Sequence, residues 1–438
     1  MDMHPIVSRY KKLEWLESND NIETKDLNWL FNSITEYKTL NITTSSEFQF
    51  SNDVESARID KIEHPWNNYL NCWIQEMVLS DNPLREMVAL FWHHQIPSQV
   101  GHKHEHAELL LEIYRKYGLD SAPQLVKAIA ANPAMLYYLD GHWSHKSEPN
   151  ENFPRELFEI FLLGEGYYTL HDVKEAARAF TGRRFDHEKY PYNLYIDETA
   201  QDQGTKTLLG KSGNFNGDDV IDLAFSQKQC AKHLSKAIIK FFLTDNPPET
   251  LVSQCADFYY ENNYHTLSLL KFLFQHPLIV NNSFPKKVKT PLELLVYFQR
   301  ETGYRTVGPK TNNFFLLKTG QILFKPHNVS GWPSGENWLF GEQLLHRLFL
   351  PSALVQIANR QSSKQSIQFK LSSRLSHANL RELRFVLDGK FDFDKFTNAL
   401  LKENIKPSLW LLGKDLPTQS FDLDTLLAII QDPNYQYC

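Results

Sequence analysis

Residues 151–159, ENFPRELFE, place ionisable side chains on an otherwise apolar helix. At the spacing of about 100° per residue in an α-helix, Glu156 lies at about +40°, Glu159 at about −20° and Arg155 at about −60° from Asn152. Apolar side chains cover most of the remaining circumference. A carboxyl in such a stripe suits general acid–base catalysis, and an arginine suits stabilisation of negative charge. The candidate catalytic residues in this segment are Glu151, Arg155 and Glu156, and Asn152 is a candidate substrate ligand.

The same spacing also fits an ordinary amphipathic surface helix. Arg155 and Glu159 stand at i and i+4, where an exposed ion pair contributes only about 0.3–0.5 kcal/mol. Asn150 or Asn152 could simply cap a helix that has Pro154 in its first turn. Spacing alone leaves both interpretations open.

A second candidate segment, PLREMVALFWHHQIP, ends a run of helix-period apolar residues with His93 and His94. Adjacent helical residues diverge by about 100°, so at most one of the two imidazoles points into a given site. Glu86 lies two turns earlier, about 10 Å away, and would reach His93 only through something between them. A histidine on such a helix is usually a satisfied core residue. The functional alternative makes His93 catalytic and makes His93, His94 and Glu159 ligands of a divalent metal that activates water.

Downstream, GHKHEHAELLLEIY places His102 with His106, and His104 with Glu108, at a spacing of four residues. That spacing can hold a divalent metal on a helix. The segment is hydrophilic and lies at a helix start, so a solvated face is the more natural expectation. No H-E-x-x-H pattern is present. The sequence therefore leaves the cofactor unknown, with a divalent metal as one candidate.

Two loops carry candidate ligand-binding side chains. Residues 201–217, QDQGTKTLLGKSGNFNG, set Asp202, Lys206 and Lys211 among glycines, which suits either an anionic or polyhydroxylated ligand or a plain hairpin tip. The order of a phosphate-binding Walker loop is missing. In GWPSGENW, the indoles of Trp332 and Trp338 suit either carbohydrate stacking or core anchoring. The candidate substrate-binding residues are Asn152, Arg178, Asp202, Lys206 and Trp332.

Helices must position nearly all of these residues. Apolar periodicity predicts helices over 66–79, 83–95, 105–117, 122–131, 153–163, 170–180, 218–243, 248–262, 265–275 and 290–301. Thr169 followed by Asp172 resembles a capping box, and Asp81-Asn82-Pro83 suits a helix start. Turn formers and interleaved aromatics predict a β-hairpin or loop insertion around 183–217. We expect a mainly α protein with an N-terminal lead-in over 1–60, a helical core domain over 61–350 and a C-terminal helical lobe over 351–438.

Composition bounds the class of protein. The 438 residues are 42% hydrophobic and 22% charged, with a formal net charge of −6, which is typical of a folded globular protein and makes nucleic acid an unexpected partner. The four cysteines show no metal-ligand spacing or disulfide framework. We see no secretory h-region and no run of eighteen apolar residues, so we expect no membrane partner and a cytoplasmic location unless a leader was removed.

Several segments together resemble a known family. The segments WIQEMVLSDNPLREMVALFWHH, NPAMLYYLD, PNENFPRELFEIFLLGEGYYTLHDVKEAARAFTG, DQGTKTLLG and GQILFKPHNVSGWPSGENWL occur in the order found in the bacterial domain-of-unknown-function 1800 family. The likeness covers about Trp66 to Arg347, and the NEN-x-x-REL-x-E block is its most specific part. The family's biochemical activity is not settled. The resemblance therefore indicates which residues are candidates for a functional site, and it implies no particular reaction.

The resemblance strengthens the functional interpretation of the polar stripe. Glu151, Asn152, Arg155, Glu156 and Glu159 match the central motif of the family, and a surface ion pair would not require that whole set. Two departures put part of any family mechanism in doubt. Where relatives resemble F-W-H-N-H-F, this chain has Gln95 in place of the second histidine, and Gln201 stands before Asp202 where relatives have a histidine.

The leading prediction is an enzyme with an internal polar pocket built by the 83–95 and 153–163 helices and the 201–211 loop. Glu156 or Glu151 would be the general base, and Arg155 or Lys206 would stabilise negative charge. The expected chemistry is hydrolysis or a related reaction, with or without assistance from a metal, on a small polar, anionic or carbohydrate substrate. The alternatives are a non-catalytic glycan- or protein-binding protein with a buried charge network, and an oxygen-dependent metal or haem enzyme. The sequence does not indicate the oligomeric state.

Overall fold

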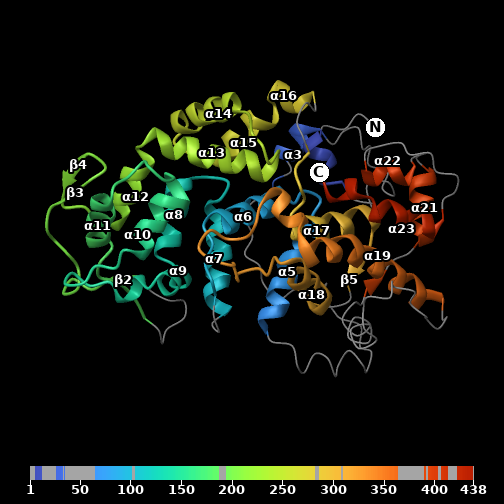
Figure 1. Cartoon of the computed structure of the whole chain (residues 1–438), viewed down its shortest axis with the longest axis horizontal. Helices are drawn as coiled ribbons and strands as arrows, with labels where there is room; N and C mark the ends of the chain where they lie inside the picture. The colour runs from blue at the N-terminus through green and yellow to red at the C-terminus, as the bar shows by residue number, and fades with distance from the viewer. Residues whose placement is uncertain are drawn as a thin grey trace. The chain divides into compact units, whose positions relative to one another are not determined.

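The computed structural model describes residues 5–11, 26–32, 34, 65–100, 104–186, 194–281, 286–306, 309–363, 389–390, 393–402, 406–412 and 422–437. Helices make up most of this part of the chain (Figure 1). The strands within it form three two-stranded antiparallel sheets. This confirms the predicted mainly α fold with a small hairpin insertion.

The chain forms two compact units, each assembled from separate stretches of sequence. The first contains residues 1–84, 286–323 and 333–438, and the second contains 85–285 and 324–332. The predicted division at residues 60 and 350 stays a prediction, because much of 1–60 and part of 351–438 lie outside the described residues. No helix in the described ranges is both long and apolar enough to cross a membrane.

The first unit is organised around α17, whose twelve residues are all buried. Thr290 caps this helix in a capping box with Glu293, and Pro291 occupies its first position. Near its other end, the guanidinium of Arg300 donates to the carbonyls of Met77, Val78 and Ser80 at 3.0, 3.0 and 2.6 Å. These carbonyls lie at the end of α5, where a helix leaves its last acceptors without intrahelical donors. The elements of this unit are α1 (Pro5–Ser8), α3 (Leu27–Asn32), α5 (Pro65–Leu79), α17 (Pro291–Thr302), β5 (Arg305–Thr306), α18 (Pro309–Thr319), η5 (Gly335–Leu339), α19 (Gly341–Ser363), β6 (Gly389–Lys390), α21 (Phe393–Lys402), α22 (Pro407–Leu412), α23 (Leu423–Gln431) and η6 (Pro433–Gln436).

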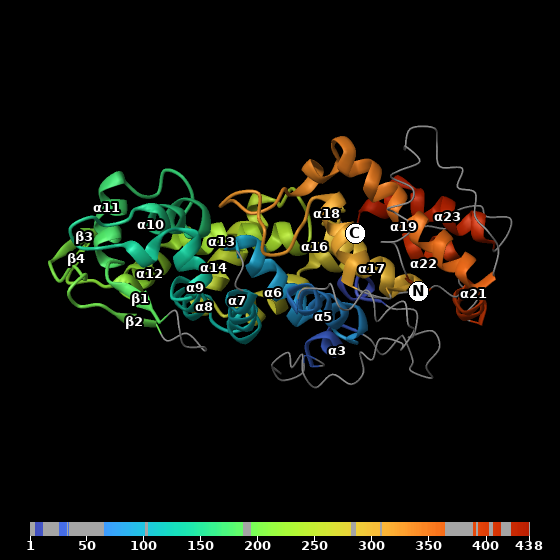
Figure 2. The same ribbon diagram turned by 90° about the horizontal axis from the view of Figure 1, so that it is seen from below.

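The second unit carries most of the candidate site residues. Its helices are α6 (Leu84–Gln95), α7 (His104–Tyr117), α8 (Ala122–Ala130), α9 (Pro133–Tyr138), η3 (Gly141–Trp143), α10 (Asn152–Glu156), η4 (Leu157–Leu162), α11 (Leu170–Ala179), α12 (Gly217–Phe225), α13 (Lys228–Phe242), α14 (Glu249–Glu261), α15 (Thr266–Phe274) and α16 (Pro277–Val280). Figures 1 and 2 both show α13 and α14 side by side. The predicted capping box of Thr169 and Asp172 is confirmed at the start of α11.

The single helix predicted over 218–243 is wrong, because the chain forms α12 and α13 there. The break falls at Ser226 and Gln227. Two tyrosine hydroxyls donate hydrogen bonds to backbone carbonyls at this point. Tyr264 donates to the carbonyl of Phe225 at 2.7 Å, and Tyr260 donates to the carbonyl of Ser226 at 3.2 Å. Ser226 also turns its own hydroxyl back onto Leu223 at 2.7 Å. These bonds satisfy the end of α12 and remove the need for a continuous helix.

The insertion over 183–217 contains two short hairpins, one of β1 (Arg183–Phe185) with β2 (Leu194–Ile196) and one of β3 (Lys206–Leu208) with β4 (Lys211–Gly213). The second hairpin turns at Leu209 and Gly210, which have φ values of 47° and 75°, as a two-residue primed turn requires. Carboxylates of α11 hold this hairpin. Asp172 accepts from the amide of Leu209 at 2.7 Å, and Glu175 accepts from the amide of Thr207 at 2.8 Å.

The helix predicted over 153–163 does not keep a regular α-helical repeat. After α10 the chain widens into the π-helical segment η4, and the amide of Leu163 donates to the carbonyl of Phe158 at 2.9 Å, five residues earlier. Gly164, at φ 86°, then ends the segment. The angular position predicted for Glu159 therefore does not hold, because it assumed about 100° per residue throughout.

Candidate functional site

The contacts collect the sequence-predicted residues into three groups rather than one. The first lies on α10 and η4, the second surrounds His93, and the third joins α11 to the loop that follows residue 200.

In the first group, Arg155 pairs with Glu151 and not with Glu159. The Nη2 atom of Arg155 lies 2.7 Å from Oε2 of Glu151, and the two side chains are 36% and 35% exposed. An ion pair with this exposure contributes at most about 1 kcal/mol. Asn152 is exposed, and its amide donates to the side chain of Asn150 at 2.8 Å. The side chains at the start of this helix are thus accessible to solvent and do not form a buried charge cluster.

Glu156 is the titratable group whose properties favour acid–base chemistry. Burial raises the pKa of its half-buried carboxyl, the nearby charge of Glu159 raises it further, and Arg155 opposes both effects. Tyr168 donates its hydroxyl to Oε2 of Glu159 at 2.8 Å, and burial followed by this hydrogen bond raises the pKa of Tyr168 to about 12. Tyr138 lies close enough for the charge of Glu156 to add to the burial that raises the pKa of its phenol. We call Tyr138, Arg155, Glu156, Glu159 and Tyr168 the Glu156 cluster.

Side chains from two other helices hold the wide turn that carries Glu159. The carbonyl of Ile160 accepts from Nε2 of His233 at 2.8 Å and from Nε2 of Gln95 at 3.4 Å. The same amide nitrogen of Gln95 donates to the carbonyl of Phe161 at 3.1 Å, and Gln229 donates to that of Leu163 at 3.0 Å. Sequence reasoning did not identify these positioning residues. The available signal was Gln95, which differs from the family pattern and lies at this turn.

The second group places His93 in an aromatic core. Its side chain is fully buried, Nε2 accepts from the amide of Phe324 at 3.1 Å, and its ring stacks on Trp332 at 4.6 Å and 20°. Burial, with a smaller effect of His94, lowers the pKa of His93 to about 3, so its imidazole is neutral near pH 7. Trp332 is only 4% exposed and anchors the core. A sugar therefore has no exposed Trp332 face on which to stack.

The predicted metal ligands do not form a site of the kind a divalent ion needs. No group of three His, Cys, Asp or Glu side chains that could hold a metal gathers within the described ranges. Nε2 of His93 is already used as the acceptor for Phe324. His102, from the second predicted metal pair, lies outside the described residues. Ligation of a metal by His93, His94 and Glu159 is thus not supported by their positions.

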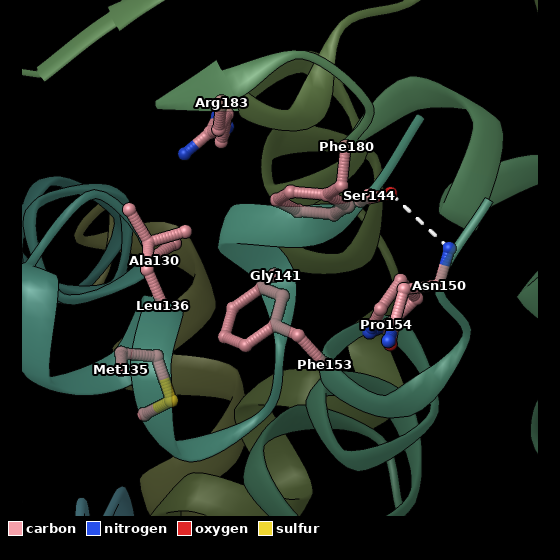
Figure 3. Close-up of a pocket in the computed structure, with 10 residues that line it drawn as sticks. All are labelled: Ala130, Met135, Leu136, Gly141, Ser144, Asn150, Phe153, Pro154, Phe180 and Arg183. Atoms are coloured by element: carbon pink, nitrogen blue, oxygen red, sulfur yellow. Dashed lines mark hydrogen bonds between the residues drawn. The ribbon is translucent and has the colours of Figure 1, made fainter. Parts of the chain in front are cut away.

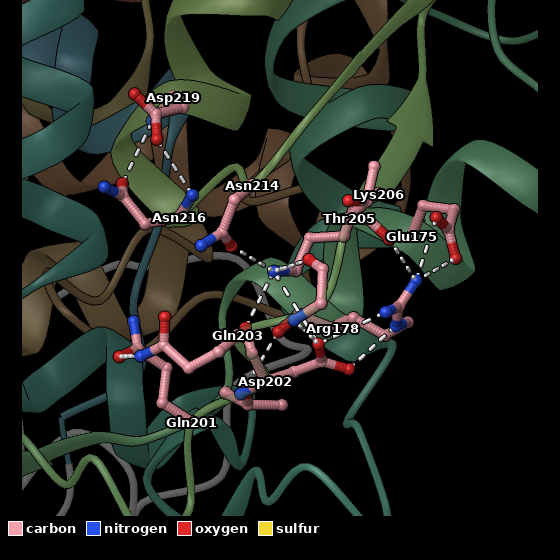
Figure 4. Close-up of polar contacts among 12 residues, drawn as sticks. Glu175, Arg178, Gln201, Asp202, Gln203, Thr205, Lys206, Asn214, Asn216 and Asp219 are labelled. Atoms are coloured by element: carbon pink, nitrogen blue, oxygen red, sulfur yellow. Dashed lines mark hydrogen bonds and ion pairs between the residues drawn. The ribbon is translucent and has the colours of Figure 1, made fainter.

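The third group is a dense polar network (Figure 4). Arg178 binds Asp202 through two bonds of 2.8 and 3.2 Å and reaches Glu175 at 2.9 Å. Lys206 is 1% exposed, and Nζ donates to the carbonyls of Asp202 and Gly204 at 2.7 and 2.9 Å and lies 3.4 Å from Oδ1 of Asn214. These acceptors match the three hydrogens of an ammonium group.

The charges of this network stabilise one another. The hydrogen bond from Arg178 lowers the pKa of Asp202, and the bonds to Asp202 and Glu175 raise the pKa of Arg178. The network connects α11 to residues 201–214, so a structural role explains these contacts without a ligand. The predicted role of Arg178, Asp202 and Lys206 in substrate binding stays a prediction, and the 29% exposure of the Arg178 side chain leaves it the most accessible of the three.

Comparison with known proteins identifies the family of the chain. A family model described as "Protein of unknown function (DUF1800)" matches residues 11–437. No curated protein matches the chain, and no solved structure matches it.

Proposed function

The chain belongs to the family of proteins of unknown function (DUF1800), and within this family we propose that it is a hydrolase-like enzyme whose acid–base residue is Glu156. The single observation that carries the proposal is the environment of this carboxyl. Glu156 is partly buried, lies near a second carboxylate and has a raised pKa, and it still reaches solvent. Perturbed carboxyls in accessible positions are common at catalytic sites.

The neighbouring side chains supply the remaining functions such a site needs. Arg155 is about one-third exposed, so its guanidinium can stabilise negative charge that develops on a substrate. Glu159 is hydrogen-bonded to Tyr168, which supports a role in holding its charge beside Glu156. Glu156 then takes a proton from water or an attacking hydroxyl and returns it to the leaving group. The substrate class that fits is a small polar, anionic or carbohydrate molecule, with no nucleic acid involved.

The proposal differs from a single internal pocket that contains His93 and Lys206. The stacked, neutral imidazole of His93 supports a core role, and the three acceptors around Lys206 support a structural one. The metal-assisted version of the reaction has less support than direct acid–base catalysis, because the predicted ligands do not gather.

The alternative is a non-catalytic binding protein. The network of Glu175, Arg178 and Asp202 favours this alternative, because a purely structural role accounts for the contacts of these polar residues. In that case the Glu156 cluster would orient α10 and η4 and would turn over no substrate.

The test is a turnover screen of the full chain with chromogenic esters, glycosides and phosphate monoesters, followed by comparison with Glu156→Gln. We expect Glu156→Gln to keep the circular dichroism spectrum and to lose about 10²–10⁴-fold in kcat, the usual contribution of a general acid–base residue. Glu261→Gln, an exposed position at the end of α14, removes the same charge and should leave turnover unchanged. Unaltered turnover in Glu156→Gln, or no turnover with any substrate class, would reject the enzymatic proposal.

The pH profile provides a second check on the assignment. Because Glu156 acts in its deprotonated form and its pKa is raised, the acidic limb of kcat/KM, where the rate rises with pH, should titrate above about 4.3, the ordinary value for glutamate. Loss of that limb in Glu156→Gln would link it to this carboxyl. A limb that persists in the variant assigns the titration to another group.

A further inference from the structure

Trp143, the last residue of η3, is a large apolar side chain that the fold leaves in solvent. Its exposed fraction of 75% is the largest among the exposed large hydrophobic side chains in the described part of the chain. Other tryptophans of that part are core residues, namely Trp73, Trp92, Trp332, Trp338 and Trp410. A single exposed apolar side chain is ordinary on a protein surface. Trp143 differs because it is held in place, adjoins other rings and lies beside the Glu156 cluster.

The backbone on both sides of Trp143 is fixed by hydrogen bonds. Asp140 adopts a φ of 57° where η3 begins, and its carbonyl accepts from the amide of Trp143 at 3.2 Å. The carbonyl of Ser144 accepts from the amide of Gly182 at 3.2 Å and from Nη2 of Arg184 at 3.1 Å. The segment is therefore tied to β1, and a ligand that meets the indole has little backbone left to order.

Trp143 belongs to a row of three rings. The ring of His142 lies 4.9 Å from that of Trp143 and 4.5 Å from that of Tyr137. The imidazole is buried, and its Nδ1 lies 2.9 Å from the carbonyl of Leu136. Tyr137 is 37% exposed. A buried imidazole thus connects two solvent-accessible rings, and we call Tyr137, His142 and Trp143 the aromatic strip.

The end of η3 contacts the segment that begins the Glu156 helix. The hydroxyl of Ser144 accepts from the amide of Asn150 at 3.1 Å, as Figure 3 shows, and Asn150 directly precedes Glu151. Gly141, Ser144 and Asn150 line the small pocket in this figure, which has room for only about one water. Trp143 is not among the lining residues, so a ligand on its indole lies on the outer surface of this region.

The last turn of α9 connects the aromatic strip to Glu156. This helix ends with Tyr137, which belongs to the strip, and Tyr138, which belongs to the Glu156 cluster. The charge of Glu156 adds to the burial that raises the pKa of the Tyr138 phenol, so these two side chains are close neighbours. An elongated ligand that lies along the strip can therefore extend to the carboxyl of Glu156.

The charges around Trp143 favour a neutral carbohydrate over other occupants. Its exposed neighbours in the sequence include Asp140, Lys146 and Glu148, so two carboxylates face one ammonium. Charged residues are depleted from the cores of protein interfaces, and a net negative surface repels nucleic acid and anionic lipid. A sugar ring presents C–H groups that suit the negative face of an indole. Its hydroxyls suit the surrounding carboxylates and the indole N–H.

We propose that the aromatic strip binds a neutral oligosaccharide, with one sugar ring stacked on the indole of Trp143 and the chain directed toward Glu156. The binding itself follows from the aromatic strip, whereas the role of this oligosaccharide as substrate rests on the proposed function. The exposed indole that the sequence led us to expect at Trp332 is thus supplied by Trp143.

The experiment is saturation-transfer NMR of the full chain with five neutral pentasaccharides, namely cellopentaose, xylopentaose, mannopentaose, maltopentaose and chitopentaose. Pentagalacturonate is the acidic comparison. We expect the best neutral ligand to bind with a Kd of about 1 mM, and saturation should be strongest on the C–H protons of one sugar ring. Pentagalacturonate should bind at least about tenfold more weakly, because the carboxylates near Trp143 repel it.

Variants connect the binding to the indole. Trp143→Ala should weaken the best ligand at least about tenfold, and Trp143→Phe should restore part of the affinity because it keeps an aromatic face. Phe340→Ala is the matched control, since it removes another exposed aromatic ring, 65% exposed, and should leave binding unchanged. Circular dichroism of each variant establishes that it folds, which the exposure of both positions favours.

Turnover separates this inference from the proposed function. With the best ligand as substrate, Trp143→Ala should raise KM and leave kcat nearly unchanged, whereas Glu156→Gln should keep the binding and lose kcat. A pentasaccharide that binds through Trp143 and is not hydrolysed would support the binding site and reject the enzymatic proposal.

Three results would overturn the inference. Failure of all five neutral pentasaccharides to bind the wild-type protein would show that the aromatic strip is not a carbohydrate site. Equal binding to Trp143→Ala would place the ligand elsewhere. Binding of pentagalacturonate as tight as that of the best neutral ligand would contradict the assignment of a neutral carbohydrate.

Discussion

Loss of the side-chain donors at the wide turn of η4 should destabilise it in a non-additive way. The carbonyl of Ile160 has two side-chain donors, His233 at 2.8 Å and Gln95 at 3.4 Å, and Gln95 also serves Phe161 at 3.1 Å. Each hydrogen bond in such a position contributes about 0.5–1.5 kcal/mol. Gln95→Ala and His233→Ala should therefore each cost about 1 kcal/mol in local stability.

The double variant should cost more than the sum of the two single variants. After either single change, Ile160 keeps one donor, but after both changes its carbonyl has lost both and pays a desolvation penalty. We expect a coupling of about 0.5–1 kcal/mol, reduced from the fully buried value because His233 is only half-buried. Gln229→Ala is the matched control, since it removes a bond to Leu163 that shares no acceptor with Gln95. The combination of Gln95→Ala with Gln229→Ala should be additive.

Hydrogen exchange measured by mass spectrometry on peptides that cover residues 157–168 reports this local stability. When the open and closed states of the turn interconvert faster than exchange, a loss of about 1.4 kcal/mol in the free energy of opening makes exchange about tenfold faster. Two outcomes would refute the reasoning. Exchange that is unchanged in Gln95→Ala would show that the bonds are not formed in solution, and additivity of Gln95→Ala with His233→Ala would show that Ile160 is not shared.

Three further predictions concern other parts of the molecule. The hydrogen bond from Arg178 lowers the pKa of Asp202, so the Arg178–Asp202 pair should stabilise residues 201–214 fully above the ordinary aspartate pKa of about 3.9. This stabilisation should be lost as the pH falls through the lower pKa that Asp202 has in the folded protein, and hydrogen exchange at about pH 7 and about pH 3 measures the loss. Arg300→Met should cost about 3 kcal/mol or more of the free energy of unfolding of the first unit, measured by denaturant titration, because the buried carbonyls at the end of α5 lose their donor. Gly217→Ala places a Cβ atom 2.5 Å from the ring of Phe180 and 2.6 Å from Nη2 of Arg183, so it should disturb the pair of Arg183 with Asp218 and cost about 1–3 kcal/mol of the free energy of unfolding of the second unit, measured by denaturant titration.

Local signals in the sequence predicted most helices and several of their ends. The capping box of Thr169 and Asp172 starts α11 as expected, and Asn82 accepts from the amide of Leu84 at 3.0 Å where α6 begins. These features depend on residues within one helical turn, so they can be recognised without the fold. The sequence also named Glu156 among the candidate bases, and burial in the structure raises the pKa of this carboxyl.

Tertiary packing decided which partners these residues have. Arg155 could pair with Glu151 or Glu159 by spacing alone, and only the structure selects Glu151. Spacing likewise cannot tell a catalytic histidine from a core one, and the contact of His93 with Trp332 joins residues far apart in sequence.

The same limit applies to the backbone at the site. The sequence by itself determined a mainly α protein of this family, with ionisable residues gathered over 151–159, because periodicity, caps and motifs depend on neighbouring residues. The wide turn at η4 depends on acceptors satisfied by His233, 73 positions from Ile160, and by Gln95, 65 positions away. The buried guanidinium of Arg183 likewise depends on Phe180 and Asp218, which lie 3 and 35 positions away in the sequence. Whether such a donor or acceptor is satisfied is decided only when distant segments pack, and that is why the structure was needed to find both features.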